Sequence, residues 1–156
     1  MQPSIEIKVL DPRLHTWGLP QYQTALAAAI DLFACIDEPL QLQPQAPAVL
    51  VPSGIALHMN SLDFCAVILP RSGLGHKKGL VLGNSVGLID ADYTAQCFIS
   101  VWNRNPSTHA EPITIQPGER IAQMMFLPVV RPEFKVVSEF SSNSVRGGGG
   151  FGSTGV

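Results

Sequence analysis

The sequence predicts an all-β protein built from short strands, either a sandwich or a barrel. Glycine and proline number 14 and 13 among the 156 residues, and neither is favourable inside a helix. Hydrophobic residues make up 46% of the chain and charged residues 14%, so the chain can bury a core instead of remaining disordered. Short apolar runs recur between turn signals, a pattern typical of β-sandwiches and barrels.

The first half of the chain contains several predicted strands. Apolar and charged residues alternate over residues 5–10, which predicts a half-buried strand. The alanine-rich run 24–34 could form a helix, but flanking prolines leave little room for one. Residues 49–59 contain two short apolar runs about a Pro-Ser-Gly turn. The continuous apolar run 64–69, ended by Pro70, is typical of a strand buried on both faces.

The second half continues this pattern and ends in a segment of different composition. Strands are predicted at 80–82, 87–89, 97–102, 113–115, 121–128 and 134–137. From Ser141 onward the chain holds six glycines, four serines and one charge, too little apolar surface to fold by itself. We therefore expect a β-domain over residues 1–140 and a flexible C-terminal arm over residues 141–156.

Charge and apolar patterning exclude several classes of protein. Ten Lys and Arg residues face twelve Asp and Glu residues, so no basic surface for nucleic acid is expected. No apolar run reaches the roughly 18 residues of a membrane span, and the N-terminus does not resemble a signal peptide. Cys35, Cys65 and Cys97 lie in apolar runs without zinc-ligand spacing. We expect buried free thiols and a cytoplasmic location.

Two segments carry side chains suited to phosphate chemistry. The segment PRSGLG, residues 70–75, follows a predicted buried strand and presents a guanidinium, a hydroxyl and glycine N–H groups, which together suit an anion. Taken alone, it could also be an ordinary polar turn. In GLIDADY, residues 87–93, Asp90 and Asp92 would share a face if the segment were extended. Such a pair either binds a cation or includes a base, although exposed acids at a strand end would look the same.

Two further segments are informative in combination. The tail segment RGGGGFGSTG, residues 146–155, has the composition of a phosphate-binding loop, but no lysine precedes its Ser-Thr pair as in a Walker A loop. Phe151 stands alone among glycines and suits a lid that stacks on a base; a low-complexity linker is the alternative. The segment GERIAQM, residues 118–124, could be a strand edge with polar decoration.

The order of five segments identifies a family. AAAIDLFA (27–34), PRSGLG (70–75), GLIDADY (87–93), GERIAQ (118–123) and RGGGGFGSTG (146–155) resemble the five motifs of the trimeric dUTP pyrophosphatases (dUTPases), in their bacterial form. The resemblance implies an antiparallel jelly-roll-like β-barrel and a homotrimer with shared active sites. It also implies Mg²⁺ and the hydrolysis of dUTP to dUMP and pyrophosphate, which limits uracil incorporation into DNA and supplies dUMP for dTMP synthesis.

The resemblance also implies roles for individual residues. Asp90 would activate the water that attacks the α-phosphorus, and Asp31 would act through water on Mg²⁺. Tyr93 would pack beneath the deoxyribose and exclude a 2′-hydroxyl. The phosphates would be held by Arg71, Ser72, Gly73 and Gln123. The uracil would be read by Asn84 and the backbone of the 83–89 hairpin, which includes Leu88 and Ile89. The γ-phosphate and the base would be covered by Arg146, Phe151, Gly152, Ser153 and Thr154.

Two positions depart from the family pattern: Ala29 and Ala95 stand where the motifs usually have glycine.

Two other functions are alternatives to the hydrolase. A dCTP deaminase shares the barrel but needs a glutamate near the cytosine amino group, where this chain has Gln96. A nucleotide-binding module without hydrolysis would be expected to lose Asp90 or the tail motif, and this chain keeps both.

Overall fold

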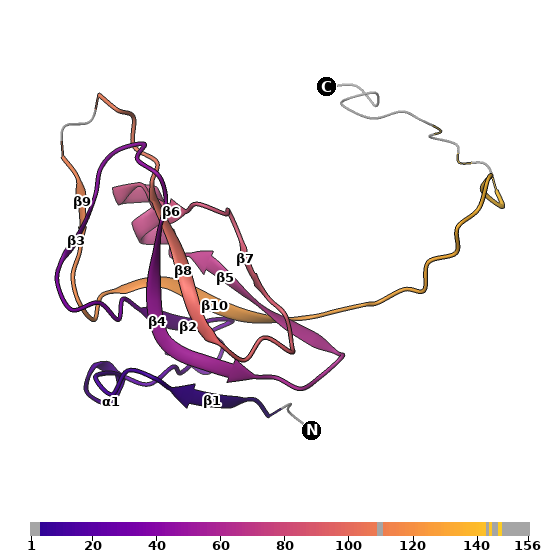
Figure 1. The fold of residues 1–156 in the computed structure, drawn as a ribbon, viewed down its shortest axis with the longest axis horizontal. Helices are drawn as coiled ribbons and strands as arrows, with labels where there is room; N and C mark the ends of the chain where they lie inside the picture. Colours follow the sequence, from indigo (N-terminus) through magenta and orange to yellow (C-terminus); the bar gives the residue numbers. More distant parts are fainter. Residues whose placement is uncertain (1–3, 109–110, 143, 145–146, 148–156) are drawn as a thin grey trace.

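The strands in the described part of the protein form three antiparallel sheets (Figure 1). The computed structural model describes residues 4–108, 111–142, 144 and 147. One four-stranded sheet has the order β1 (Glu6–Val9), β4 (Val49–His58), β8 (Gln96–Asn103) and β6 (Leu80–Leu82). The other has the order β2 (Ile30–Phe33), β10 (Arg120–Pro128), β5 (Phe64–Pro70) and β7 (Gly87–Ile89). A two-stranded sheet joins β3 (Leu40–Leu42) to β9 (Ile113–Ile115).

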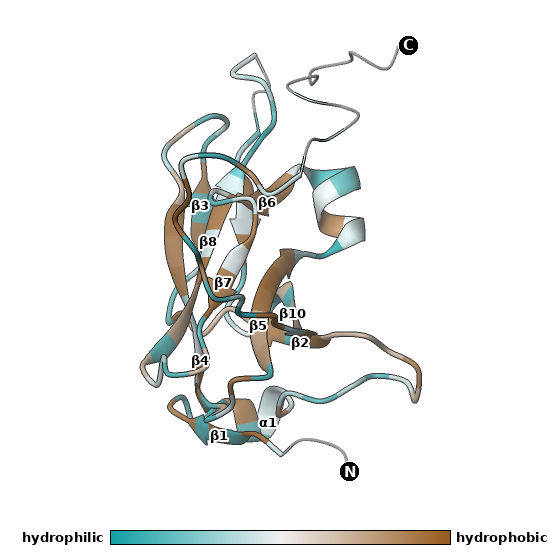
Figure 2. Cartoon of the chain, turned by 90° about the vertical axis from the view of Figure 1, so that its right-hand side faces the viewer, coloured by the Kyte–Doolittle hydropathy of each residue, from teal (hydrophilic) through white to brown (hydrophobic). Residues whose placement is uncertain are grey.

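The hydrophobic core lies where the inner faces of the two larger sheets meet. Ile55 and Ile99 from one sheet, and Ile68 and Met124 from the other, are at most 1% exposed and belong to one cluster. The strands are coloured mainly as hydrophobic in Figure 2, whereas the loops are more hydrophilic. The antiparallel pairing and this shared core confirm the all-β class predicted from the sequence.

The strand β5 shows why the central apolar run was predictable. Four consecutive residues, Cys65 to Ile68, are buried, and because successive side chains of a strand point to opposite faces, both faces of β5 are covered. The predicted strands at 5–10, 64–69, 80–82, 87–89, 97–102, 113–115 and 121–128 are all present, with ends shifted by at most one residue.

The run 24–34 is no helix, in agreement with the flanking prolines that leave little room for one: residues 25–26 form a turn, and β2 begins at Ile30, where pairing with β10 starts. Two local predictions were wrong. Residues 49–58 form the single strand β4, whose register shifts between Pro52 and Ala56. Residues 134–137 form no strand, since no strand among the described residues pairs with them and Phe134 is 88% exposed.

Three short elements were not predicted from the sequence. They are the helix α1 (Leu14–Trp17), the strand β3 and the five-residue π-helical turn η1 (Leu74–Lys78). Each has five or fewer residues, too few to show a periodic pattern. Of these, η1 matters for function, because it follows the PRSG segment directly.

The segment 83–86 connects two sheets and is not the tip of a paired hairpin. Strand β6 pairs with β8, whereas β7 pairs with β5. The expected 83–89 hairpin was therefore wrong as a two-stranded unit. The turn itself is present: the N–H of Ser85 donates to the carbonyl of Leu82 at 3.2 Å, and the N–H of Val86 donates to the carbonyl of Asn84 at 2.6 Å.

The cysteines agree with the prediction of buried free thiols. Cys35, Cys65 and Cys97 are buried and form no disulfide. Burial raises the pKa of the Cys97 thiol to about 11, so it stays protonated at neutral pH. Among the described residues, no helix is both long and apolar enough to cross a membrane.

After β10 the chain leaves the body of the molecule (Figure 1). The described residues from 129 to 142 form neither helix nor strand, and those from 130 onward are exposed. The division between a domain over 1–140 and an arm over 141–156 remains a prediction.

Candidate functional site

A cation-rich pocket of about 510 Å³ lies where β2, β10 and the end of β5 meet η1. Its lining contains five predicted site residues that were assigned to phosphate or metal: Asp31, Arg71, Ser72, Gly73 and Gln123. Lys77 and Lys78 also line it and were not predicted. The remaining lining residues are Gln23, Ala27, Ala29 and Leu74. We call this cavity the arginine pocket.

The register of β10 explains why residues so distant in sequence meet. Gln123 is opposite Asp31 on one side and Leu69 on the other. Residues directly opposite in antiparallel strands share a face, so the amide and the carboxylate point the same way. The Nε2 of Gln123 donates to the carbonyl of Pro70 at 2.9 Å, which ties β10 to the residue just before Arg71.

Asp31 is held by two arginines. Its Oδ1 lies 3.0 Å from Nε of Arg71, and its Oδ2 lies 3.1 Å from Nη1 of Arg120. Nη1 of Arg71 also donates to the carbonyl of Arg120 at 2.9 Å. Arg120 belongs to the GERIAQM segment, but no role was predicted for it. The signal that could have found it is a charged residue directly before the buried pair Ile121 and Ala122.

The loop after β5 leaves room for a ligand beside Gly73. A Cβ placed on Gly73 would meet no atom of the described residues within 4 Å, so this part of the chain does not require glycine there. The N–H of Gly75 donates to the carbonyl of Arg71 at 2.9 Å, which closes the turn. Ser72 and Gly73 are exposed at the mouth of the pocket. The loop is therefore open on the side where an anion would approach.

The described residues include no group of three or more Asp, Glu, His or Cys side chains placed to hold a metal ion. Asp31 is the only acidic residue that lines the described part of the arginine pocket, and both of its oxygens accept contacts from arginines. Mg²⁺ commonly keeps several waters and is bound through one or two carboxylates and substrate phosphates. These residues fit a Mg²⁺ that is held mainly by a bound triphosphate and reached by Asp31 through water.

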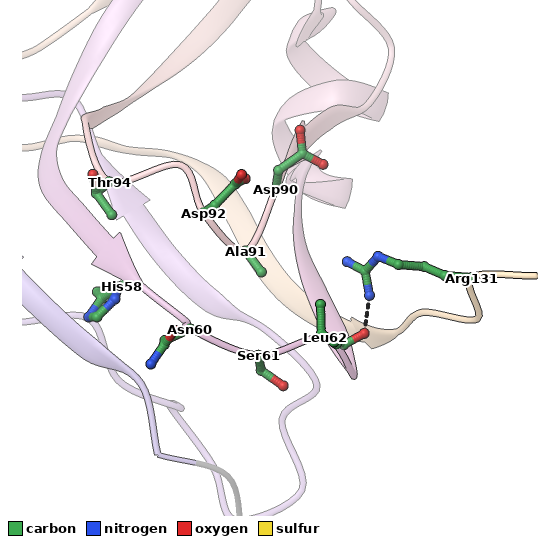
Figure 3. Close-up of a pocket in the computed structure, with 9 residues that line it drawn as sticks. All are labelled: His58, Asn60, Ser61, Leu62, Asp90, Ala91, Asp92, Thr94 and Arg131. Atoms are coloured by element: carbon green, nitrogen blue, oxygen red, sulfur yellow. Dashed lines mark hydrogen bonds between the residues drawn. The ribbon is translucent and has the colours of Figure 1, made fainter.

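A second pocket, of about 590 Å³, contains Asp90 and Asp92 (Figure 3). We call it the aspartate pocket. Both carboxylates come from the short segment that follows β7, and His58 and Arg131 lie on other parts of the rim. Arg131 donates to the carbonyl of Leu62. The other lining residues are Asn60, Ser61, Ala91 and Thr94.

The segment around Asp90 is a turn, which corrects the extended conformation assumed from the sequence. The strand β7 ends at Ile89, and the N–H of Tyr93 donates to the carbonyl of Asp90 at 3.1 Å. The hydroxyl of Tyr93 donates to the carbonyl of Gln96 at 3.0 Å. Asp90 and Asp92 still line one pocket, because the turn, and not strand alternation, brings them together.

The residues expected to read uracil lie apart from both pockets' linings. Asn84 and Leu88 are exposed, the latter by 62%, whereas Ile89 is 9% exposed and belongs to the core. Because the side chain of Ile89 belongs to the core, this residue could face a ligand only through its backbone. The predicted residues Arg146, Phe151, Gly152, Ser153 and Thr154 lie outside the described residues.

The two pockets share no lining residue. Asp90 lies in one, and Arg71, Ser72, Gly73 and Asp31 lie in the other. The described part of a single chain thus separates the predicted base from the predicted phosphate ligands.

Comparison with known proteins gives a consistent result along the whole chain. A family model described as dUTPase matches residues 15–155. A protein of Serratia proteamaculans named deoxyuridine 5'-triphosphate nucleotidohydrolase is 53% identical over 156 residues, which cover 99% of each chain. A protein of Xanthomonas campestris with the same name is 52% identical and covers 100% of this chain and 99% of its own.

Solved structures agree with this result. The dUTPase of Staphylococcus bacteriophage 80alpha with dUPNHPP is 27% identical, with a TM-score of 0.82, and covers 99% of this chain and 100% of its own. A mutant dUTPase from phage phi11 of S. aureus, which coordinates a structural Mg(II) ion, is 22% identical with a TM-score of 0.75 and covers 89% of this chain and 99% of its own. The likeness confirms the antiparallel, jelly-roll-like fold.

Proposed function

The chain belongs to the dUTPase family and hydrolyses dUTP to dUMP and pyrophosphate, and we propose that it does so in active sites shared between the subunits of a homotrimer. The observation that supports shared sites is the separation of Asp90 from the arginine pocket. A base and the phosphate that it serves must lie within reach of one water molecule. A second copy of the chain can bring its Asp90 to the arginine pocket of the first.

In this proposal Asp90 accepts a proton from the water that attacks the α-phosphorus. The bond between the α-phosphorus and the bridging oxygen breaks, and pyrophosphate leaves. General base catalysis contributes roughly 10²- to 10⁴-fold, so positioning and charge neutralisation must supply the rest, as in other phosphoryl transfers. The exposed position of Asp90 after β7 suits a group that meets a substrate held by another subunit.

The phosphates of dUTP bind in the arginine pocket. Arg71 offers its guanidinium, Ser72 its hydroxyl and Gly73 its open backbone, while Gln123 contacts the phosphates or the attacking water. A bound Mg²⁺ would neutralise part of the triphosphate charge. Asp31 would hold that ion through water, because both carboxylate oxygens already contact arginines.

The nucleoside part is read by the segment between β6 and β8. Asn84 and the backbone at Leu88 and Ile89 contact the uracil edge, and the closeness of this backbone leaves no room for the methyl group of thymine. Tyr93 packs beneath the deoxyribose. The hydrogen bond from its hydroxyl to Gln96 supports this role, because it fixes the ring beside the turn that carries Asp90.

The C-terminal arm, residues 141–156, is proposed to close over the nucleotide. Arg146, Ser153 and Thr154 would contact the γ-phosphate, and Phe151 and Gly152 would cover the base. The exit of the chain from the body after β10 supports this proposal, because it allows the arm to reach a neighbouring subunit. We expect the enzyme to act in the cytoplasm, where it would supply dUMP and keep uracil out of DNA.

A subunit-mixing experiment tests the shared site. Asp90→Asn and Arg71→Gln chains should each be nearly inactive alone. After mixing, unfolding and refolding, some sites would combine an intact Asp90 from one chain with an intact Arg71 from another. We expect pyrophosphate release from dUTP to recover to about a tenth or more of the wild-type rate, and light scattering to give the mass of a trimer. Refolded mixtures that stay inactive although they form trimers would contradict the proposal.

Substrate selectivity tests the nucleoside assignments. Turnover should be fastest with dUTP and at least 10²-fold slower with dTTP, dCTP and UTP, since a site built around one base and sugar leaves polar groups unpaired with the others. Equal turnover of all four would refute the assignments. Ammonia release from dCTP would instead support a deaminase.

A further inference from the structure

We propose that Arg120 is a positioning residue for dUTP hydrolysis, which orients Arg71 through Asp31 without itself contacting the substrate. The inference rests on the proposed binding of the phosphates in the arginine pocket. Arg120 does not line that pocket, whereas both residues that it contacts do. It therefore influences the pocket through Asp31 and Arg71, which line the pocket.

An irregular register at the start of β10 places Arg120 beside Asp31. Arg120 is opposite Phe33 and Ala122 is opposite Leu32, so two steps along β10 match one step along β2. Such a bulge changes the direction in which a side chain points. Ile121 and Ala122 are 2% and 0% exposed although they are neighbours in a strand. With both of these residues turned inward, Arg120 is left on the outer side, where Asp31 lies.

The contacts of Arg120 form a closed ring with the other two residues. Its Nη1 lies 3.1 Å from Oδ2 of Asp31, and the other oxygen of Asp31 lies 3.0 Å from Nε of Arg71. The ring closes where Nη1 of Arg71 donates to the main-chain oxygen of Arg120 at 2.9 Å. Two contacts to different nitrogens fix the plane of the Arg71 guanidinium. The edge that carries Nη2 is left to bind a phosphate, since no partner for it occurs among the described residues.

The charges of the ring explain why a second arginine is needed. The Asp31 side chain is only 12% exposed, compared with 34% for Arg71 and 45% for Arg120, and a partly buried carboxylate requires compensation. With Arg71 alone, the negative charge of the Asp31 carboxylate would cancel the positive charge of the Arg71 guanidinium. With Arg120 added, the ring carries one net positive charge, and Arg71 keeps its attraction for the triphosphate.

Variants of Arg120 with a matched control test this inference. Arg104 serves as the control, because it is exposed like Arg120. Its side chain donates to the main-chain carbonyl of Gly75 at 3.0 Å but makes no ion pair within the described part of the chain. We expect Arg120→Gln to lower kcat/KM for dUTP about 10-fold, mainly through KM, and Arg120→Lys to recover part of the loss. Arg104→Gln should stay within about twofold of wild type. Thermal unfolding and light scattering should show that all three variants remain folded trimers.

A double-mutant cycle separates positioning from direct contact. If Arg120 acts through Asp31, Arg120→Gln should change kcat/KM by less than about twofold in an Asp31→Asn background. The same 10-fold loss in both backgrounds, or equal values for Arg120→Gln and Arg104→Gln, would overturn the inference. If Arg120→Gln does not fold, Arg120→Lys is measured in the same two backgrounds and judged by the same criterion.

A further variant distinguishes this failure from failure of the proposed function. Arg71→Gln should lower kcat/KM by about 10²-fold if the phosphates bind beside Arg71. Wild-type kinetics for Arg71→Gln would refute the phosphate assignment itself. A strong loss for Arg71→Gln without any loss for Arg120→Gln would refute only the positioning role.

Discussion

The arginine pocket and the aspartate pocket differ in what holds their charged groups in place. Around Arg71, two ion pairs and a main-chain hydrogen bond join β2, β10 and the loop after β5. Around Asp90, a turn after β7 carries the carboxylate, and the backbone of that turn provides the bond that closes it. One pocket is braced by side chains from three places in the sequence, and the other depends on the local path of the backbone.

This difference indicates how the chain divides the work of one reaction. Phosphates carry several negative charges, so cationic ligands for them must be held against mutual repulsion, and in the proposed function the ring around Asp31 would do this within one subunit. The proposed base, Asp90, would need only to be exposed at a fixed position where a neighbouring subunit can present the substrate. Side-chain changes should therefore weaken the arginine pocket mainly through KM, and backbone changes should weaken the aspartate pocket mainly through kcat.

The largest expected effect concerns Asp90. Asp90→Asn keeps the shape of the side chain but removes its ability to accept the proton of the attacking water. We expect kcat to fall about 10³-fold, within the range for loss of a general base, while a non-hydrolysable dUTP analogue binds with a Kd within about threefold of wild type. Pyrophosphate release and calorimetric titration measure the two quantities.

Asp92→Asn is the matched control, because Asp92 lies in the same turn and lines the same pocket. We expect its kcat to stay within about fivefold of wild type. Similar losses for both variants would show that the pair acts together and that the assignment of the base to Asp90 alone is wrong.

The aspartate pocket also shows where sequence reasoning stopped. The residues Asp90 and Asp92 were found from their spacing, but an extended segment was assumed, and the turn at Ala91 and Asp92 became visible only in the structure. A strand and a turn can both place two residues on one side, so spacing alone does not distinguish them. The identity of the candidate residues was predictable, and their geometry was not.

In the arginine pocket, the position of the loop was predictable from the sequence, but part of the set of charged residues was not. Arg71 and its loop were predictable because they follow a long buried strand, whose end places them at the edge of a sheet. The contribution of Arg120 depends on a bulge, and the contribution of Lys77 and Lys78 depends on the π-helical turn η1. Both features arise from pairing and packing between distant segments, which a local pattern does not record.

Gly87→Ala tests the dependence of Asp90 on the backbone. A Cβ on Gly87 would lie 3.2 Å from Cβ of Ile68, the core residue opposite it in β5. Relief of this contact requires β7 to move away from β5, which shifts the turn that follows. We expect overpacking to lower the free energy of unfolding by about 1–3 kcal/mol and misplacement to lower kcat about 10-fold. Thermal unfolding and steady-state kinetics measure these changes.

Gly87→Ala should not affect the binding of phosphates beside Arg71. The Kd for inorganic pyrophosphate therefore provides an internal control. A variant with wild-type kcat and lowered stability would show that the position of Asp90 tolerates movement of β7, and the contrast between the pockets would be lost.

Gly73→Ala makes the complementary test in the arginine pocket. Its Cβ would meet no atom within 4 Å in the part of the chain that the structure describes, and its φ of −65° suits alanine, so stability should be unchanged or slightly raised. The added methyl group would instead occupy space at the mouth of the pocket, where a phosphate approaches. We expect KM for dUTP to rise about 10-fold with kcat within about threefold, which corresponds to about 1.4 kcal/mol of binding energy. An unchanged KM would show that the phosphates do not pass close to Gly73.

The smallest expected effect comes from the two lysines on η1. Lys77 and Lys78 are exposed and line the arginine pocket without an ion pair in the described structure, so they attract the triphosphate only through solvent. We expect Lys77→Gln and Lys78→Gln each to raise KM about threefold at low ionic strength, and the difference to shrink as salt shortens the range of the interaction to about 8 Å at 0.15 M. Lys135→Gln, an exposed lysine beyond β10 that lines neither pocket, should leave KM unchanged at every salt concentration. An effect that persists at high salt would mean that a lysine touches the phosphates directly, and the arginine pocket would then hold its substrate with more than the ring around Asp31.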